Sequence, residues 1–285
     1  MKLFKNNPWI LLFPSLLFMI IPMYGLAIAV LESTTGTMGF TLASYRQLLE
    51  SDRFLSSILF SLRTSFIATI LALLVGLIIT RSFSHYLERN LPRLSLWLPM
   101  IFPHFVWGYV IILIFSETGL FAQMFVSMGL IANTGDFPIL TRDSAGMGIL
   151  LTYIWKEVPF VVLMLFPVYS AIPQSYYDLV ETLGGNRWEQ FKTVDWPHIQ
   201  SVLIETFFII FAFTLTAYEV PALIGTNFPE MVSVLSYQWF YSGSWDDRPL
   251  AFAAMTSISL FITLTAFLGY MYLNRKRLRA MRGRL

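Results

Sequence analysis

The chain has 285 residues, of which 56% are hydrophobic and 13% are charged, and its mean hydropathy is +0.65. Soluble domains usually carry about 25% charged residues, so this composition is typical of an integral membrane protein, and a net charge of +2 is too small to indicate a nucleic-acid partner. The absence of cysteine excludes disulfides, thiolate metal sites and a cysteine nucleophile. The three histidines are scattered, which argues against a histidine metal cluster; they are His85, His104 and His198.

A helix needs about 20 mostly apolar residues to cross the hydrocarbon core. Six segments meet this requirement, and the first is expected to be a retained helix because no small-residue cleavage site follows a short apolar core. The segments are Trp9 to Leu31, Ser56 to Thr80, Leu94 to Ser116, Gly146 to Ile172, Ser201 to Ile224 and Pro249 to Leu273. The sequence therefore predicts an all-α polytopic membrane protein with six transmembrane helices.

The distribution of Lys and Arg predicts the orientation of these spans. Basic residues are concentrated in the segments that share a side with the two termini, for example at Arg81, Arg187 and Arg275, whereas acidic residues dominate the opposite segments. Cytoplasmic loops carry an excess of Lys and Arg, so both termini are expected in the cytoplasm. The apolar stretch Gly119 to Leu130 is too short to span, and we expect it to lie along the outer interface or to dip back.

Three regions follow from this arrangement. Residues 1–55 form an N-terminal transmembrane helix and an outer segment, residues 56–273 form a five-helix membrane domain, and residues 274–285 form a basic cytoplasmic tail. A basic tail beside a membrane is expected to contact anionic lipid rather than nucleic acid.

The cytoplasmic loop of residues 173–199 reads as two short helices joined by a turn. A capping-type residue with an acidic residue three positions later starts each predicted helix. Glycine accepts the left-handed conformation found just past helix ends, and the residue before a proline is disfavoured in a helix, so both predict helix ends. The starts are Ser175 with Asp178 and Asn186 with Glu189, and the ends are Gly184-Gly185 and Pro197.

Apolar residues recur at roughly helical spacing along both predicted helices, with polar residues between them. The loop is therefore expected to be an amphipathic hairpin that faces the cytosol. One interpretation is that such a hairpin only packs under its own membrane bundle. The apolar positions are Leu179, Leu183, Trp188, Phe191 and Val194, and the polar ones are Glu181, Arg187, Glu189 and Lys192.

This loop resembles the cytoplasmic signature of ABC importer permeases, which runs Glu-Ala-Ala-x-x-x-Gly, a spacer, and a hydrophobic-x-hydrophobic-Pro ending. The spacing from Gly184 to Pro197, the Arg187-Trp188 pair and the position of Phe191 fit this pattern. The start departs from it, because Asp178 keeps only the acidic character of Glu-Ala-Ala.

In that family the loop is the coupling helix, which sits in a groove of a cytoplasmic ATPase subunit. The resemblance implies the type I ABC importer permease fold in a bacterial or archaeal cytoplasmic membrane. The implied partners are an ATPase expected to be a homodimer, a second homologous permease or a second copy of this chain, and an extracytoplasmic substrate-binding protein. The ATPase-coupling residues would be Asp178, Leu179, Glu181, Leu183, Gly184, Gly185, Arg187, Trp188, Phe191 and Pro197.

A second stretch, Ala217 to Ala253, resembles permeases of the polyamine, iron and related small-ion branch. There an acidic or small residue precedes Val-Pro and a Gly, and an aromatic-rich loop follows; here Glu219 precedes Val220-Pro221. This resemblance implies a polyamine (spermidine or putrescine) or a similar small ion as the solute. Together the two resemblances extend from Ser56 to Leu273.

Ionisable residues near the bilayer centre cost about 2.5 to 3.5 kcal/mol each on insertion scales, so each is expected to face a partner or water. Lys156 and Glu157 lie near the middle of the fourth span, and neighbours on a helix do not face each other, so each needs another partner. Arg63 and Glu219 match in depth and form a candidate pair. These charges either fix helix packing, within the chain or against the second permease, or line a path that attracts a cation. The candidate path residues are Tyr153, Trp155, Lys156, Glu157, Tyr218 and Glu219.

No G-x-x-x-x-G-K-[ST] sequence occurs, so ATP is expected to be bound and hydrolysed by a separate subunit, and this chain is expected to have no cofactor of its own. No HExxH or GxSxG motif occurs either, so we expect neither a catalytic residue nor a metal site. Two other hypotheses stay open: an ion- or proton-coupled secondary transporter, and a non-transporting assembly or sensor protein. The glycine hairpin favours the importer permease, because a carrier has no reason to keep a capped helical hairpin there.

Overall fold

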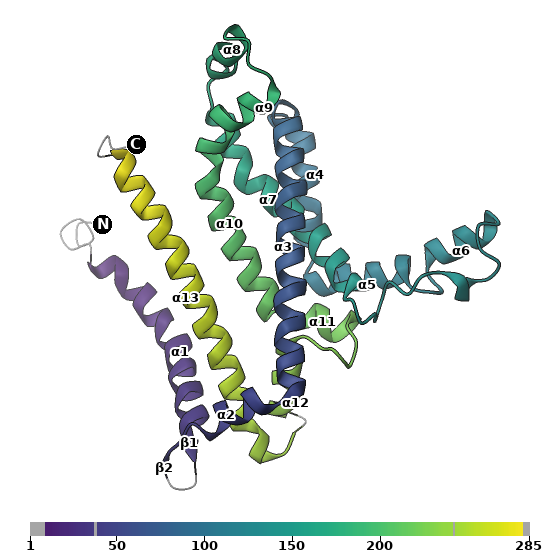
Figure 1. The fold of residues 1–285 in the computed structure, drawn as a ribbon, viewed down its shortest axis with the longest axis vertical. Helices are drawn as coiled ribbons and strands as arrows, with labels where there is room; N and C mark the ends of the chain where they lie inside the picture. Colours follow the sequence, from purple (N-terminus) through teal and green to yellow (C-terminus); the bar gives the residue numbers. More distant parts are fainter. Residues whose placement is uncertain (1–8, 37–38, 242, 282–285) are drawn as a thin grey trace. The chain divides into compact units, whose positions relative to one another are not determined.

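The computed structural model describes residues 9–36, 39–241 and 243–281, and its regular secondary structure there is helical apart from two short paired strands (Figure 1). Six helical segments are long and apolar enough to cross a membrane. They are Leu12–Thr34, Asp52–Leu87, His104–Ser127, Met147–Ala171, Arg187–Thr216 and Trp245–Arg275. The end of the predicted basic tail, Arg282 to Leu285, lies outside the described residues.

The chain divides into two compact units. Within the described residues, the first comprises those up to Leu55 and Leu235–Thr263, and the second comprises Ser56–Val234 and those from Leu264 onward. The elements, in chain order, are α1 (Trp9–Thr34), β1 (Thr35–Gly36), β2 (Gly39–Phe40), α2 (Ala43–Glu50), α3 (Asp52–Leu87), α4 (Asn90–Ile101), α5 (His104–Phe115), α6 (Leu120–Ser127), α7 (Met147–Ala171), α8 (Gln174–Thr182), α9 (Arg187–Gln190), a π-helical turn (Phe191–Asp195), α10 (Trp196–Thr216), α11 (Glu219–Ile224), α12 (Val232–Tyr241) and α13 (Arg248–Met281). Short 3-10 turns occupy Thr134–Asp136 and Trp245–Asp247.

The first unit holds α1, the strand pair and α2. The hydroxyl groups of Ser33 and Tyr45 lie 2.7 Å apart, which ties α1 to α2. Arg53 donates to the side-chain oxygen of Gln238 at 2.6 Å, so the first residues of α3 contact α12 within the same unit.

The core of the second unit forms where α3, α7 and α10 pack together. α3 presents small residues to α7, and a Cβ on Gly76 would lie 2.5 Å from Cγ1 of Val161. Small residues let membrane helices approach closely, so this glycine sets the α3–α7 distance. One apolar cluster surrounds the fully buried Tyr153, and a second surrounds Leu165 and Ile199.

Two of the six predicted spans are broken. The segment Leu94 to Ser116 forms α4 and α5, because Pro103 holds Phe102 in an extended conformation (φ −86°, ψ 139°) between them. The segment Ser201 to Ile224 forms α10 and α11, with Ala217 extended at the break. A break inside a membrane leaves backbone carbonyls without helical partners, so other groups must satisfy them.

Candidate functional site

The hairpin of α8 and α9 stands at one end of the second unit, beside the last turns of α3 (Figure 1). The chain reverses at Gly184, whose φ of +82° is favourable only for glycine and a few polar residues. The amide of Gly185 then donates to the carbonyl of Val180 at 2.8 Å and closes α8. A Cβ on Gly185 would lie 2.9 Å from that same carbonyl, so the two glycines are required for different reasons.

The start of α9 is the capping box predicted from the sequence. The side chain of Asn186 accepts from the amides of Trp188 and Glu189, and the Glu189 carboxylate accepts from the amide of Asn186 at 2.6 Å. This arrangement satisfies donors that have no partner at a helix start.

The two other predicted boundaries are wrong. α8 begins at Gln174 after Pro173, and no side chain caps it, because proline fixes the entering backbone without needing an amide hydrogen. Pro197 does not end the second helix either: the chain continues through the π-helical turn into α10. Pro197 has no amide hydrogen and would interrupt the hydrogen bonding of a regular α-helix. The wider π-helical turn places the backbone irregularity just before Pro197, so the helix continues past it.

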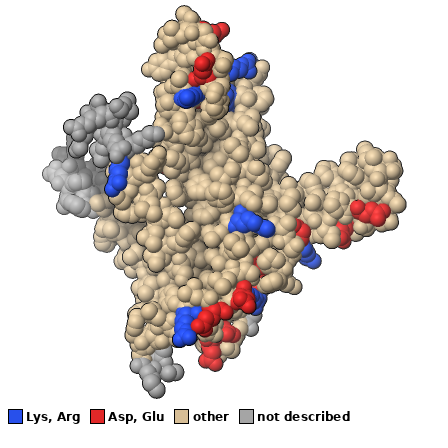
Figure 2. Space-filling model, viewed as in Figure 1, with Lys and Arg blue, Asp and Glu red and all other residues tan. Residues whose placement is uncertain are grey.

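The outer surface of the hairpin exposes apolar side chains beside charged ones. Leu183, Trp188 and Leu179 are 79%, 67% and 59% exposed. Asp178, Glu181 and Arg187 are also exposed, and Figure 2 shows acidic and basic side chains together on the α8–α9 end. Phe191 is turned inward, with its ring stacked 5.5 Å from that of Trp188. Of the predicted coupling residues, only Gly185 and Phe191 are partly buried, and the others are exposed.

Three residues that the sequence interpretation did not single out join the hairpin to α3. The carboxylate of Asp195, in the π-helical turn, is fully buried. Its Oδ2 atom lies 2.8 Å from Nε of Arg81 on α3, and its Oδ1 atom accepts a 2.6 Å hydrogen bond from Tyr177 on α8. Arg81 also donates to the backbone carbonyl of Arg187 at 2.7 Å. A signal was present in the sequence: an acidic residue between Val194 and Trp196 is expected to need a cation.

Burial raises the pKa of Tyr177, and the hydrogen bond to Asp195 raises it further, so its hydroxyl remains protonated at neutral pH and keeps donating. A polar cavity of about 480 Å³ adjoins this cluster. Arg81, Tyr169, Tyr177, Arg187 and Asp195 are among its lining residues.

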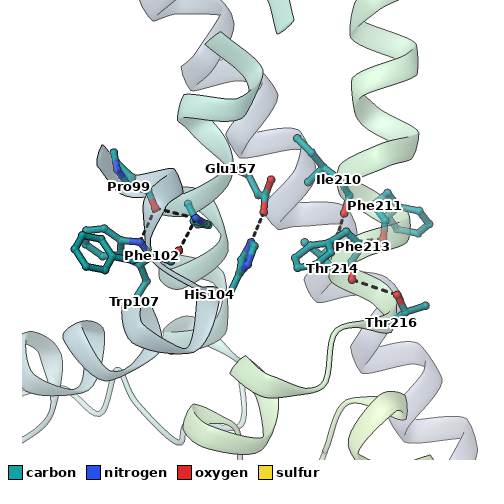
Figure 3. Close-up of polar contacts among 11 residues, drawn as sticks. Pro99, Phe102, His104, Trp107, Glu157, Ile210, Phe211, Phe213, Thr214 and Thr216 are labelled. Carbon is teal, nitrogen blue, oxygen red and sulfur yellow. Dashed lines mark hydrogen bonds and ion pairs between the residues drawn. The ribbon is translucent and has the colours of Figure 1, made fainter. Parts of the chain in front are cut away.

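Lys156, midway along α7, donates hydrogen bonds to backbone carbonyls at the break in the third predicted span. Its Nζ atom donates to the carbonyls of Pro99 and Phe102, each at 2.8 Å, and the side chain is only 6% exposed. Trp107 adds a second donor to the Pro99 carbonyl at 2.8 Å (Figure 3). The charge thus joins α7 to the junction of α4 and α5.

Glu157 has a separate partner, His104, the first residue of α5. Glu157 Oε1 and His104 Nε2 are 3.0 Å apart and point toward each other, and Glu157 is 7% exposed (Figure 3). Because the carboxylate is buried and paired, this structure does not present it as an open cation site. His104 was noted only as a scattered histidine, although its place directly after Pro103 marks it as the start of a helix.

The remaining candidates are divided between the core and the surface. Tyr153 is buried, whereas Trp155 is exposed and lies against Trp107 with ring centroids 5.7 Å apart. Tyr218 and Glu219 are exposed at the break between α10 and α11. Among the path candidates, Trp155, Tyr218 and Glu219 are therefore exposed, and Tyr153, Lys156 and Glu157 are buried.

The expected Arg63–Glu219 pair is not among the ion pairs of the described residues. The Arg63 guanidinium instead donates to the carbonyl of Ala145 at 2.7 Å and lies 5.3 Å from the centroid of the Phe60 ring. The Ala145 carbonyl, in the loop before α7, lies within hydrogen-bond distance of Arg63 on α3. Arg63 therefore has a partner without Glu219. Within the described part of the chain, no group of three or more acidic or histidine side chains could hold a metal ion.

Comparison with known proteins agrees with this geometry. Residues 89–279, more than half of the chain, match the family model described as "Binding-protein-dependent transport system inner membrane component". The inner membrane ABC transporter permease protein YnjC of Escherichia coli (strain K12) is 26% identical to this chain. The aligned region covers 82% of this chain but only 43% of that relative's length. The probable sulfate transport system permease protein cysT of Chlorella vulgaris is 26% identical over 73% of this chain and 77% of its own.

Among solved structures, the chain resembles one in the crystal structure of a bacterial ABC transporter involved in the import of the acidic polysaccharide alginate. The TM-score is 0.69 at 17% identity, with 98% of each chain covered. This similarity shows the fold, the type I ABC importer permease fold predicted from the sequence. The six apolar helices, together with the match to an inner membrane transport family, make the chain a multi-pass protein of the cytoplasmic membrane. The chain belongs to the family of binding-protein-dependent transport system inner membrane components.

Proposed function

We propose that this chain is the permease subunit of an ATP-driven importer, with the α8–α9 hairpin as the surface on which a separate ATPase subunit acts. A second permease, either a homologue or a second copy of this chain, would complete the membrane path. An extracytoplasmic binding protein would deliver the solute. The chain has no P-loop sequence, so the nucleotide would be bound by the ATPase subunit.

The observation that carries the proposal is the exposure of Leu179, Leu183 and Trp188 on a charged hairpin at the cytoplasmic end. Large apolar side chains grouped on a surface rimmed by charges are typical of a protein-binding site. The glycine turn and the Asn186 capping box give this surface a fixed shape. A short, ordered hairpin connected directly to α7 and α10 is suited to passing on a movement imposed by a partner.

For the solute, we propose a polyamine or a similar small ion, with Tyr218 and Glu219 on its path. The support is the sequence pattern of residues 217–253 and the exposure of both side chains at the α10–α11 break. A carboxylate beside an aromatic face is suited to an ammonium group. The relatives are named for sulfate and alginate transport, both anionic solutes, so the solute panel must include anions.

Uptake into proteoliposomes tests the proposal. The chain would be reconstituted with and without the ATPase purified from the same membranes, and with binding protein, ATP and radiolabelled putrescine, spermidine, sulfate or an acidic oligosaccharide. We expect uptake only with both ATPase and ATP. Uptake driven by an ion gradient without the ATPase would contradict the importer assignment and favour a secondary transporter. Uptake of an anion alone, unaffected by Glu219→Gln, would overturn only the polyamine proposal.

A further inference from the structure

Arg81 and Asp195 hold three elements together at a point where the carboxylate is fully buried and the Arg81 side chain is 34% exposed. Asp195 follows α9 in the π-helical turn, Arg81 lies near the end of α3, and Tyr177 lies on α8. The distances of 2.8 Å from Arg81 Nε and 2.6 Å from the Tyr177 hydroxyl place both donors on one carboxylate. The start of α10, the end of α3 and the hairpin therefore meet at Asp195.

Arg81 contacts the hairpin at two further places. It donates to the Arg187 carbonyl at 2.7 Å, and its guanidinium lies 5.0 Å from the centroid of the Phe191 ring. A planar guanidinium can donate in several directions and stack on an aromatic ring at the same time, which a lysine ammonium cannot. The first residue of α9 and the first residue of the π-helical turn are both fixed relative to α3 by this one side chain.

Stability alone is a weak explanation for such a pair. Removing the Asp195 charge fully and the Arg81 charge partly from water offsets much of their attraction, and apolar pairs of similar size often replace buried ion pairs without loss of stability. An ion pair does impose a defined geometry, because its hydrogen bonds are directional. The polar cavity of about 480 Å³ beside the pair leaves the hairpin less closely packed against α3 on that side. The polar contacts of Arg81 then carry more of the connection.

We propose that Arg81 and Asp195 are positioning residues for energy coupling: they make α3 follow the hairpin when the ATPase moves it. Tyr177 supports them by holding the second carboxylate oxygen. This inference rests on the proposed function. The backbone joins the hairpin directly to α7 and α10 but not to α3, so the side chains of Arg81 and Asp195 supply the link to α3.

The test compares variants in the complete complex of permease, ATPase and binding protein. The double variant Arg81→Met with Asp195→Asn removes the ion pair without leaving an unpaired buried charge, and the introduced amide oxygen can still accept from Tyr177. Arg81→Lys keeps the charge but loses the fork of donors. The control is Arg89→Met, an exposed arginine on the same cytoplasmic side for which the described residues show no ion pair. Complex recovery, ATP hydrolysis and solute uptake are measured for each.

We expect the double variant to retain the ATPase on purification while solute uptake per ATP hydrolysed falls about tenfold, within the range of typical coupling free energies. Arg81→Lys should give an intermediate ratio, and Arg89→Met the wild-type ratio. A wild-type ratio in both the double variant and Arg81→Lys would overturn the proposal. So would a loss of uptake that only matches a loss of bound ATPase, since that indicates a purely structural role. If wild-type uptake needs no ATPase, the proposed function fails instead, and the two failures are distinguishable.

Discussion

Nε of Arg81 lies 2.8 Å from Oδ2 of Asp195, so the end of α3 is bonded to the turn from which α10 begins. The carboxylate is fully buried, and its other oxygen accepts from Tyr177. Breaking a buried pair by removing one member leaves an uncompensated charge, which costs far more than removing both.

This asymmetry predicts the stability of the single and double variants. Arg81→Met alone should lower the free energy of unfolding by about 3 kcal/mol, because Asp195 keeps its charge without its cation. Adding Asp195→Asn should restore most of that loss. Unfolding midpoints in detergent measure both. Additive losses in the double variant would show that the two side chains are not energetically coupled.

The hairpin turn predicts different effects at its two glycines. Gly184→Asn should leave ATPase binding near the wild-type level and Gly184→Val should weaken it, because a left-handed backbone costs most non-glycine residues about 1–2 kcal/mol but suits asparagine. Gly185→Ala should be more damaging, since its Cβ would lie 2.5 Å from Val180 Cγ1 and 2.9 Å from the Val180 carbonyl.

The measurement is the amount of ATPase retained when the permease is purified. Adding Val180→Ala to Gly185→Ala provides the matched control, because it removes the side-chain overlap and leaves the carbonyl contact. We expect partial recovery. Equal retention for all four variants would contradict the assignment of the turn to ATPase binding.

Lys156 is predicted to stabilise the broken helix rather than to bind solute. Lys156→Met leaves the Phe102 carbonyl without this donor, whereas the Pro99 carbonyl keeps Trp107. A buried unsatisfied carbonyl costs about 1–3 kcal/mol, so the unfolding midpoint in detergent should fall clearly. Lys192→Met, at an exposed cytoplasmic lysine, is the control and should shift it little. A solute affinity that changes while stability does not would favour a path role for Lys156.

The pH dependence of stability follows from Tyr177. Because the folded protein raises the pKa of this hydroxyl above its unfolded value of about 10, its contribution is complete below pH 10 and is lost as pH rises beyond that value. The stability difference between wild type and Tyr177→Phe should therefore be constant from about pH 7 to 9 and shrink above about pH 10. Unfolding midpoints across that range would show it. A difference that changes between pH 7 and 9 would mean that another group titrates at this site.

The elements that follow local rules could be predicted from the sequence. Long apolar segments predicted six spans, although the third lies at His104–Ser127 rather than Leu94 to Ser116. The Gly184 turn and the Asn186 capping box could be predicted because their partners lie within a few residues. The errors arose where the chain has other ways to satisfy the backbone. Pro173 starts α8 without a side-chain cap, and the π-helical turn lets the helix pass Pro197.

The partners of the charges could not be predicted, because they come from distant parts of the chain. Lys156 bonds to carbonyls that become free only when the segment breaks at Phe102-Pro103. The depth argument that paired Arg63 with Glu219 used charged side chains alone and overlooked the backbone carbonyl of Ala145. In a membrane such carbonyls are strong acceptors, so they compete with carboxylates for the same cations.

Site-specific crosslinking from the hairpin tests the central claim most directly. The chain has no cysteine, so Leu183→Cys introduces a single reactive thiol at a side chain that is 79% exposed in the native protein. In native membranes, a short bifunctional reagent should join it to a nucleotide-binding subunit, and a membrane-impermeant maleimide should reach it only from the cytoplasmic side. A thiol labelled from the outer side, or one labelled from the cytoplasm that never crosslinks to a nucleotide-binding protein, would contradict the account.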